Sequence, residues 1–217
     1  MIKPNYEKKQ KVICNFDKQI DKYLRMKRLV IALVGLFTAL SFSSCGYNTM
    51  VSKDENVKGK WAQVENAYQR RADLIPNLVA TVKGAAEHEQ GTLTAVVEAR
   101  AKATSVTVDP SNLTEEAIAE YQQTQDALSQ SIGRLLVSVE AYPDLKANSN
   151  FQELQAQLEG TENRISVERR AYNEAVQDYN TTVRSFPNNI MASLFGFKSK
   201  GTFQAQPGAD TAPTVSF

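Results

Sequence analysis

The sequence predicts an all-α protein, in which an antiparallel bundle of three to four long helices follows an N-terminal lipoprotein-type signal. Three observations predict this architecture. Apolar residues recur at steps of three, four and seven over long stretches of the chain, which is the period of amphipathic helices. Strand-like alternation of apolar and polar residues is not found after residue 45. A short apolar run, preceded by basic residues and followed by a cysteine, lies upstream of the repeats.

The charge of the chain is unevenly distributed. Residues 1–44 hold nine Lys and Arg against three Asp and Glu, a net charge of +6, whereas residues 45–217 hold sixteen against 21, a net charge of −5. A basic leader before an acidic body is typical of an exported protein, because the positive end stays in the cytosol while the body crosses the membrane. The acidic body argues against nucleic acid as a partner, since it offers phosphates no net positive field.

The leader has the three parts of a secretory signal over residues 26–44. Two basic residues precede an apolar run at 29–40, and small residues follow it. The uncharged stretch has 16 residues, fewer than the roughly 20 that a helix needs to span the hydrocarbon core. Translation is expected to start at Met26, so residues 1–25 are interpreted as a start-site artefact or a cytosolic lead.

Phe42-Ser43-Ser44-Cys45 resembles a bacterial lipobox, although Phe42 stands where Leu is usual. In such a sequence the cysteine thiol receives a diacylglycerol and a peptidase cuts just before it, so Cys45 is the predicted lipidation site. Two or three acyl chains anchor a protein firmly, since each buried methylene contributes about 0.8 kcal/mol. Residues 45–53 would then form a lipid-anchored tether. The alternative is an uncleaved anchor helix with an incidental cysteine.

The bundle is expected over residues 54–200 and begins with a long amphipathic helix. Its apolar stripe comprises Val57, Trp61, Val64, Tyr68, Ile75, Leu78 and Val82. Arg71 occupies the position missing from this stripe. Pro76 predicts a kink, because a proline inside a helix removes a backbone hydrogen bond. The helical pattern continues over residues 85–104, with a break expected near Gly91 and with Leu93, Val96 and Val97 facing inward.

Two further helices are expected after a loop at residues 104–112. The first carries Tyr121, Leu128, Leu135 and Tyr142 at intervals of seven, with Ile118, Ile132 and Val139 beside them, and should end at Pro143. The second should be capped at its N-terminus by Ser149 or Asn150 and stop at Pro187, with Phe151, Leu158, Ile165, Tyr172, Tyr179 and Phe186 at intervals of seven. A sustained seven-residue period favours near-antiparallel packing. A short amphipathic piece follows at 190–197, and residues 201–217 are expected to form a disordered tail.

Several runs resemble the LemA family of bacterial envelope proteins. They include QRRADLIPNLV at residues 69–79, AYPDLKA at residues 141–147, and Arg169, Tyr172-Asn173, Tyr179-Asn180 and Phe186-Pro187. Together the matching pieces span about residues 47–198. The resemblance implies a helical bundle held at the membrane by its N-terminus and facing outward, with no agreed biochemical activity. The usual anchor in the family is a transmembrane helix, from which Cys45 in its lipobox-like setting departs.

The residues selected as candidates for partner interaction or for setting helix register are Arg70, Arg71, Asp73, Pro76, Tyr142, Pro143, Asp144, Arg169, Tyr172, Asn173, Tyr179 and Asn180. Arg71 needs a partner if it is buried on the apolar stripe. Glu162, Glu168 or Asp144 could supply one. The pair would then either fix the register of the helices or form a docking site for a partner.

Tyr172-Asn173 and Tyr179-Asn180 lie one heptad apart, with each tyrosine on the apolar stripe and each asparagine beside it. Their polar groups could simply bond across the bundle, or they could form a polar and aromatic ledge for a peptide or glycan.

The sequence predicts neither an enzyme nor a cofactor site. The chain has one histidine, His88, and His88-Glu89 lacks the second histidine of a zinc protease motif. A hydrolase triad would need a histidine base, and the glycines form no phosphate-binding loop. The expected function is therefore a membrane-anchored, outward-facing envelope scaffold or adaptor, which binds another envelope protein or itself. The alternative is a membrane-shaping or lipid-organising protein whose residues 190–197 touch the bilayer.

Overall fold

The computed structural model describes residues 4–84 and 90–205, with side chains at 22–31, 46–84 and 90–205. Its helices are α1 (Pro4–Lys83), α2 (Gln90–Ser105), α3 (Glu115–Val139), α4 (Pro143–Lys146), α5 (Ser149–Arg184) and α6 (Asn188–Phe195). The described residues form an all-α structure, as predicted. The chain divides into two compact units, Met1–Thr49 and Met50–Phe217.

The first unit contains the backbone of the predicted signal, all of it within α1. The side chains of residues 32–45 lie outside the described ones, so the signal, the start at Met26 and the lipidation of Cys45 stay predictions. No helix in the part of the chain that was searched, the described residues, combines the length and apolar character of a membrane span.

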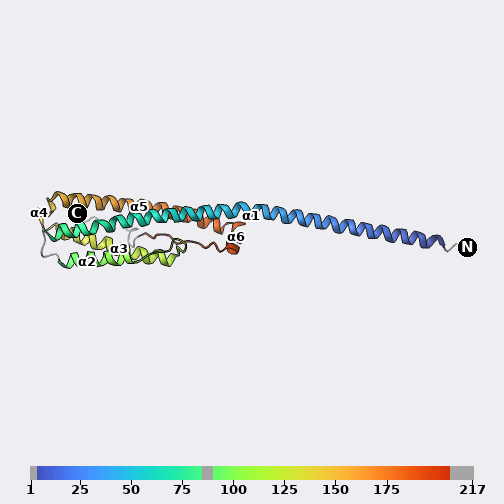
Figure 1. Ribbon diagram of the computed structural model, residues 1–217, viewed down its shortest axis with the longest axis horizontal. Coiled ribbons are helices and arrows are strands. Elements are labelled where there is room, and N and C mark those ends of the chain that lie inside the picture. Colours follow the sequence, from blue (N-terminus) through green and yellow to red (C-terminus); the bar gives the residue numbers. More distant parts are fainter. Residues whose placement is uncertain (1–3, 85–89, 206–217) are drawn as a thin grey trace, which may run out of the picture. The chain divides into compact units, whose positions relative to one another are not determined.

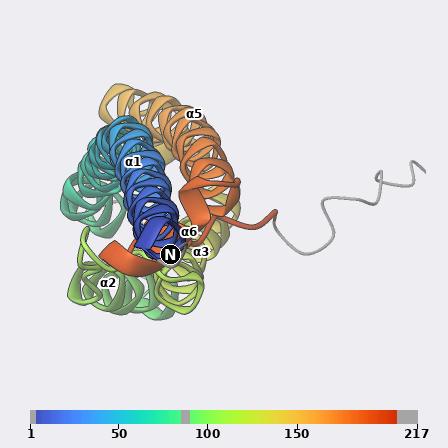
Figure 2. The same cartoon turned by 90° about the vertical axis from the view of Figure 1, so that its right-hand side faces the viewer.

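The second unit is built from four long helical segments that alternate in direction: α1 from Met50 onward, α2, α3 and α5 (Figure 1). Lys53 of α1 meets Asp178 of α5, and Arg71 meets Glu162, so these two helices run in opposite directions. Seen along the bundle, α1, α5, α3 and α2 surround a shared interior (Figure 2). The predicted packing of long helices side by side is therefore present.

Helix ends follow local chemistry, with two differences from the predicted boundaries. The Thr114 side chain caps α3 by accepting from the Ala117 amide at 3.2 Å. Asn148, rather than Ser149 or Asn150, caps α5, because its side chain reaches the amides at 150 and 151. Pro143 begins the short helix α4 instead of ending α3, since a proline at the first helical position loses no bond.

The predicted stripes of α1, α3 and α5 form the core. Every stripe residue predicted in α1 is buried, and Met50, one heptad before Val57, extends the stripe into the predicted tether. The body therefore begins near Met50 and not at residue 54. Two expected core residues are on the surface: Val97 is 49% exposed and Phe186 is 80% exposed, because the α5 stripe ends at Val183.

The helix expected to continue from residue 85 to 104 is separate from α1. The first helix ends at Lys83 and α2 begins at Gln90, just before the break expected at Gly91. Residues 85–89, which include His88, lie outside the described residues. Pro76 lies inside α1, exposed, and the helix continues through it.

The boundary predicted for the disordered tail is too early. Gly201 and Phe203 are buried, and Phe203 belongs to the core. We call residues 200–204 the C-terminal segment. It is non-helical and follows α6 after a short connection that starts at Gly196. Residues 206–217 lie outside the described part of the chain.

Candidate functional site

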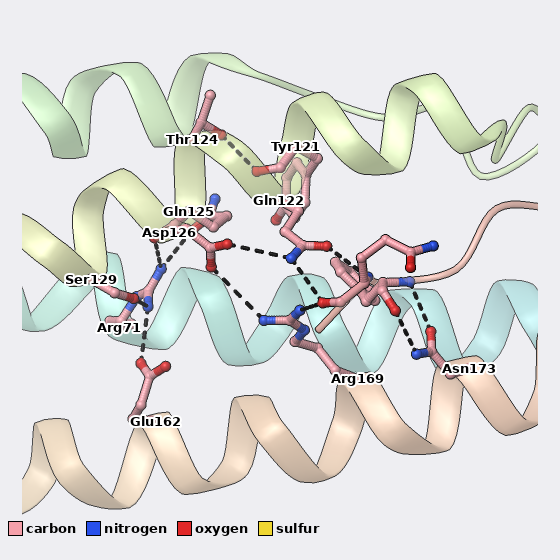
Figure 3. Close-up of polar contacts among 12 residues, drawn as sticks. Arg71, Tyr121, Gln122, Thr124, Gln125, Asp126, Ser129, Glu162, Arg169 and Asn173 are labelled. Carbon is pink, nitrogen blue, oxygen red and sulfur yellow. Dashed lines mark hydrogen bonds and ion pairs between the residues drawn. The ribbon is translucent and has the colours of Figure 1, made fainter. Parts of the chain in front are cut away.

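Arg71 is 2% exposed and lies between α1, α3 and α5 (Figure 3). Its guanidinium donates to Glu162 Oε2 at 3.0 Å, to the Gln125 carbonyl at 3.0 Å, to Gln125 Oε1 at 2.8 Å and to the Ser129 hydroxyl. It also lies 5.1 Å from the centre of the Tyr68 ring. Arg71 thus ties three helices together at one level of the bundle.

Glu162 is the carboxylate that pairs with Arg71, one of the three partners suggested by the sequence. Glu168 pairs instead with Arg164 at 2.7 Å, and Asp144 is an exposed residue of α4. The Glu162 side chain is 55% exposed, so the charge pair itself is partly screened. The buried Gln125 oxygens depend on the guanidinium more strongly than Glu162 does, since no solvent replaces it there.

The other candidates near these residues are not gathered into one site. Arg70, Asp73 and Pro76 lie on the exposed side of α1, where Asp73 accepts from Gln69 at 2.7 Å. Tyr142 precedes α4 and packs partly against the core, while Pro143 is exposed.

The second polar constellation holds the C-terminal segment. Asn173 donates to the Phe203 carbonyl and accepts from the Phe203 amide, both at 2.9 Å. Asn180 makes the same pair of bonds with Lys200, at 2.9 and 2.8 Å. Gln122 of α3 makes the same pair with Gln204, both at 3.0 Å. We call Gln122, Asn173 and Asn180 the amide clasp.

The heptad spacing of the two asparagines matches the backbone that they hold. Seven residues of helix rise about 10.5 Å, and three residues of extended chain rise about 10 Å. Asn173 and Asn180 therefore meet residues 203 and 200, three positions apart, and the C-terminal segment runs antiparallel to α5. The sequence showed the two Tyr-Asn pairs, but nothing in it marked Gln122 or residues 200–204 as their partners.

Aromatic side chains of the bundle pack against the C-terminal segment that the amide clasp holds. The Phe203 ring is stacked on Trp61, with centroids 6.0 Å apart and an interplanar angle of 14°, and it packs edge-on against Tyr172 at 5.4 Å. The Tyr172 hydroxyl donates to the Gly201 carbonyl at 3.0 Å. The Arg169 guanidinium lies 4.8 Å from the Phe203 centroid, and it donates to the Gln204 carbonyl at 3.0 Å.

The first residues of the C-terminal segment are held by charge and by shape. Lys200 Nζ lies 2.9 Å from Asp54 Oδ1 and 5.3 Å from the centre of the Tyr179 ring. A Cβ added to Gly201 would come within 2.5 Å of Glu115 Cα and 2.8 Å of the Thr114 carbonyl oxygen. Because these are backbone atoms that cannot rotate away, only glycine fits at this position.

Burial and ion pairing shift the pKa values of the titratable groups in this region. Burial raises the pKa of the Tyr172 and Tyr121 phenols, and it raises the pKa of Tyr179 to about 12, so all three stay protonated at neutral pH. Burial opposes ionisation of Asp54, but hydrogen bonds from Lys58 and Lys200 outweigh it and lower the pKa of that carboxyl. Among the residues searched, which are the described ones, no group of three His, Cys, Asp or Glu side chains could hold a metal ion.

A family model described as the LemA family matches residues 60–217, most of the chain. The chain belongs to the LemA family. This match includes α2, α3, α4, α5 and α6, most of the second unit's part of α1, and the C-terminal segment.

This LemA-family chain has relatives in several bacteria. It is 26% identical over 202 residues to magnetosome protein MamQ 1 of Paramagnetospirillum magneticum, covering 84% of this chain and 74% of the relative. It is 24% identical over 201 residues to magnetosome protein MamQ of Magnetospirillum gryphiswaldense, covering 84% and 72%. It is 23% identical over 176 residues to protein LemA of Metamycoplasma hominis, covering 81% and 75%.

Proposed function

We propose that the chain is a non-enzymatic, membrane-anchored scaffold of the bacterial cell envelope, which binds a partner protein through its helical bundle. The anchor is the N-terminal region around Cys45, and the body faces away from the cytoplasm. Relatives that are named as magnetosome proteins support an association of this chain with a cellular structure.

The observation that carries this proposal is the contrast between the inside and the outside of the bundle. The polar residues that could have formed a reactive site are engaged internally: Arg71 by α3 and α5, and the asparagines by the C-terminal segment. The bundle meanwhile exposes apolar side chains on and beside α6, where Phe186 is 80%, Ile190 60% and Leu194 73% exposed. Grouped exposed apolar residues mark an interaction surface.

A second candidate is direct contact of α6 with the lipid bilayer. Ala192 of α6 packs in the same core cluster as Met50, so α6 lies at the end of the bundle where α1 enters it. Met50 is five residues from Cys45, and five residues span at most about 18 Å. If Cys45 is lipidated, this tether keeps Met50 within about that distance of the membrane, and the exposed Ile190 and Leu194 are then the apolar residues of α6 available to contact lipid.

Site-specific crosslinking in living cells tests the surface and separates the two candidates. A photo-crosslinking amino acid at position 190 or 194 should capture a defined protein if α6 docks a partner, whereas it should capture lipid if α6 rests on the bilayer. The matched control is position 137, because Val137 is 71% exposed on α3 and far along the chain from α6. Crosslinks at 137 equal to those at 190 would contradict both candidates.

The anchor is tested separately by Cys45→Ala. We expect an uncleaved precursor that no longer incorporates labelled fatty acid, because the thiol is the only attachment atom in the lipobox-like run. A mutant with the same mass and the same labelling as the wild type would contradict the lipid anchor. Ser44→Ala serves as the control, since it keeps a small residue at the cut.

A further inference from the structure

The amide clasp binds backbone in the way that a neighbouring β-strand does. Each of its three side chains both donates to and accepts from a single residue of the C-terminal segment. Such paired bonds do not depend on the identity of the bound side chains. They give affinity for an extended polypeptide, while pockets for alternate side chains give specificity.

The specificity comes from three positions of the bound segment. A cation is selected at position 200 by Asp54 and the Tyr179 ring. The backbone at residues 114 and 115 admits only glycine at position 201. The Trp61 and Tyr172 rings, with the Arg169 guanidinium, enclose an aromatic ring at position 203. The bundle thus carries a receptor for an extended Lys-Gly-x-Phe sequence.

The bound segment can enter and leave from the side. Asn173 and Asn180 are half-buried and line an open groove along α5, together with Thr202, Phe203 and Gln204. A strand can therefore reach the clasp without separating the helices. Its covalent connection to α6 is short, starting at Gly196 with φ 78°. Short hinges of this kind favour exchange of identical elements between two copies.

We propose that the amide clasp is a peptide-binding site, and that its ligand in trans is the same Lys-Gly-Thr-Phe-Gln segment of a second copy of this chain. In the structure the site is filled by its own residues 200–204. In an exchanged pair, Phe203 of each copy stacks on Trp61 of the other. The clasp works in this way whether or not α6 binds a partner protein.

The first experiment empties the clasp of the full-length chain in detergent without changing a receptor residue. Gly201→Ala should expel the C-terminal segment, because its Cβ collides with the backbone of Glu115. Trp61 is the only tryptophan, so its fluorescence should change as Phe203 leaves. Gly133→Ala is the matched control, since a Cβ at Gly133 meets nothing within 4 Å.

A synthetic peptide with the sequence of residues 198–205 should then bind the Gly201→Ala protein and restore the Trp61 signal. Adding Asn173→Ala to that protein should weaken peptide binding about tenfold or more, because two hydrogen bonds are lost. A peptide with alanine in place of its glycine should not bind. Failure of the natural peptide to bind an emptied clasp would overturn the proposal.

The second experiment tests exchange between copies by complementation. The Gly201→Ala chain has an empty clasp and a segment that does not fit, whereas an Asn173→Ala/Asn180→Ala chain has a weakened clasp and a good segment. Adding Trp61→Phe to the latter leaves the only tryptophan on the receptor chain. Mixing the two should form a one-to-one complex and return the Trp61 fluorescence of the Gly201→Ala chain to that of the wild-type protein.

Each result bears on the proposal. A complex that forms between the mixed variants, and that an excess of the natural peptide dissociates, supports it. A peptide that binds while the mixed variants stay apart would overturn the part that names a second copy as the ligand's source. Circular dichroism of each variant checks that its helices are intact. Crosslinking at positions 190 and 194 is independent of these results, so the α6 proposal stands or fails separately.

Discussion

The cores at the two ends of the bundle are built from different kinds of side chain. The end away from Met50 has an almost entirely aliphatic core, in which Phe151 is the one fully buried aromatic residue of the described cluster. The end near Met50 has an aromatic core built around Trp61, and Phe203 of the C-terminal segment completes this core. Arg71 lies between the two. The aliphatic core consists of residues from helices alone, whereas the aromatic core also includes a residue of the C-terminal segment.

Substitution of Arg71, which lies between the two cores, should have the largest effect on the free energy of unfolding. Arg71→Ala leaves the buried Gln125 Oε1 without this donor and opens a cavity, so we expect a loss of about 3–5 kcal/mol in the free energy of unfolding. Arg71→Leu should cost less, because it refills the space. Urea denaturation of both variants measures this. A loss under about 0.5 kcal/mol, usual for surface residues, would show that Arg71 has no such role.

Truncation within each core should separate the two ends. Leu135→Ala removes a fully buried side chain from the aliphatic core, and we expect a loss of about 3 kcal/mol in global stability. Phe203→Ala should cost less globally, because the C-terminal segment can detach while the four helices remain. Fluorescence of Trp61 and circular dichroism should change together in the first variant, and fluorescence should change first in the second. Coincident transitions in both variants would mean that the two ends unfold as one.

Acid should loosen the aromatic end selectively. The pKa of Asp54 is lower in the folded protein than its ordinary value of about 3.9, so its contribution is complete above that value and is lost as the pH falls through the folded one. The groups that face it are Lys58, Lys200 and Tyr179. Trp61 fluorescence should therefore stay constant from pH 7 to about pH 4 and change below it. Asp54→Asn should abolish that change; an unaltered transition would assign it to another carboxylate.

The smallest expected effect is on the stability of the bundle when Gly133 or Gly201 is replaced by alanine. Gly133→Ala on the exposed side of α3 should stabilise the bundle by about 0.5–1 kcal/mol, because alanine favours a helix over glycine. Gly201→Ala at the aromatic end should have the opposite sign. Thermal unfolding of the two variants compares them directly, and stabilisation by both would show that the C-terminal segment tolerates a side chain at position 201.

The sequence predicted the helical part of this comparison because burial imposes a period on each helix. The stripes of α1, α3 and α5 follow from that period, and Arg71 is conspicuous because it interrupts one of them. Helix boundaries were less predictable. Asn148, Ser149 and Asn150 can all cap a helix, and only the geometry of the turn selects among neighbours.

The sequence indicated the two asparagines of the amide clasp but neither Gln122 nor the segment that the clasp binds. Tyr172-Asn173 and Tyr179-Asn180 repeat with the heptad and are visible for that reason. Their ligand has no period, because a single extended strand held by side chains needs none, and its composition resembles that of the tail that follows. Nothing in the sequence distinguishes Gln122 either, since it lies beside the apolar stripe of α3 like many solvated residues.

The position of the C-terminal segment along the chain also sets an order of events during synthesis. Residues 200–204 leave the ribosome after every helix that they contact, so the aromatic end stays open until the whole bundle has been made. A chain that stops short of residue 200 would keep its four helices but expose Trp61 and Tyr172. Closure of the clasp therefore follows the synthesis of every helix of the bundle, and a protease that attacks exposed aromatic residues would cleave chains that lack the C-terminal segment first.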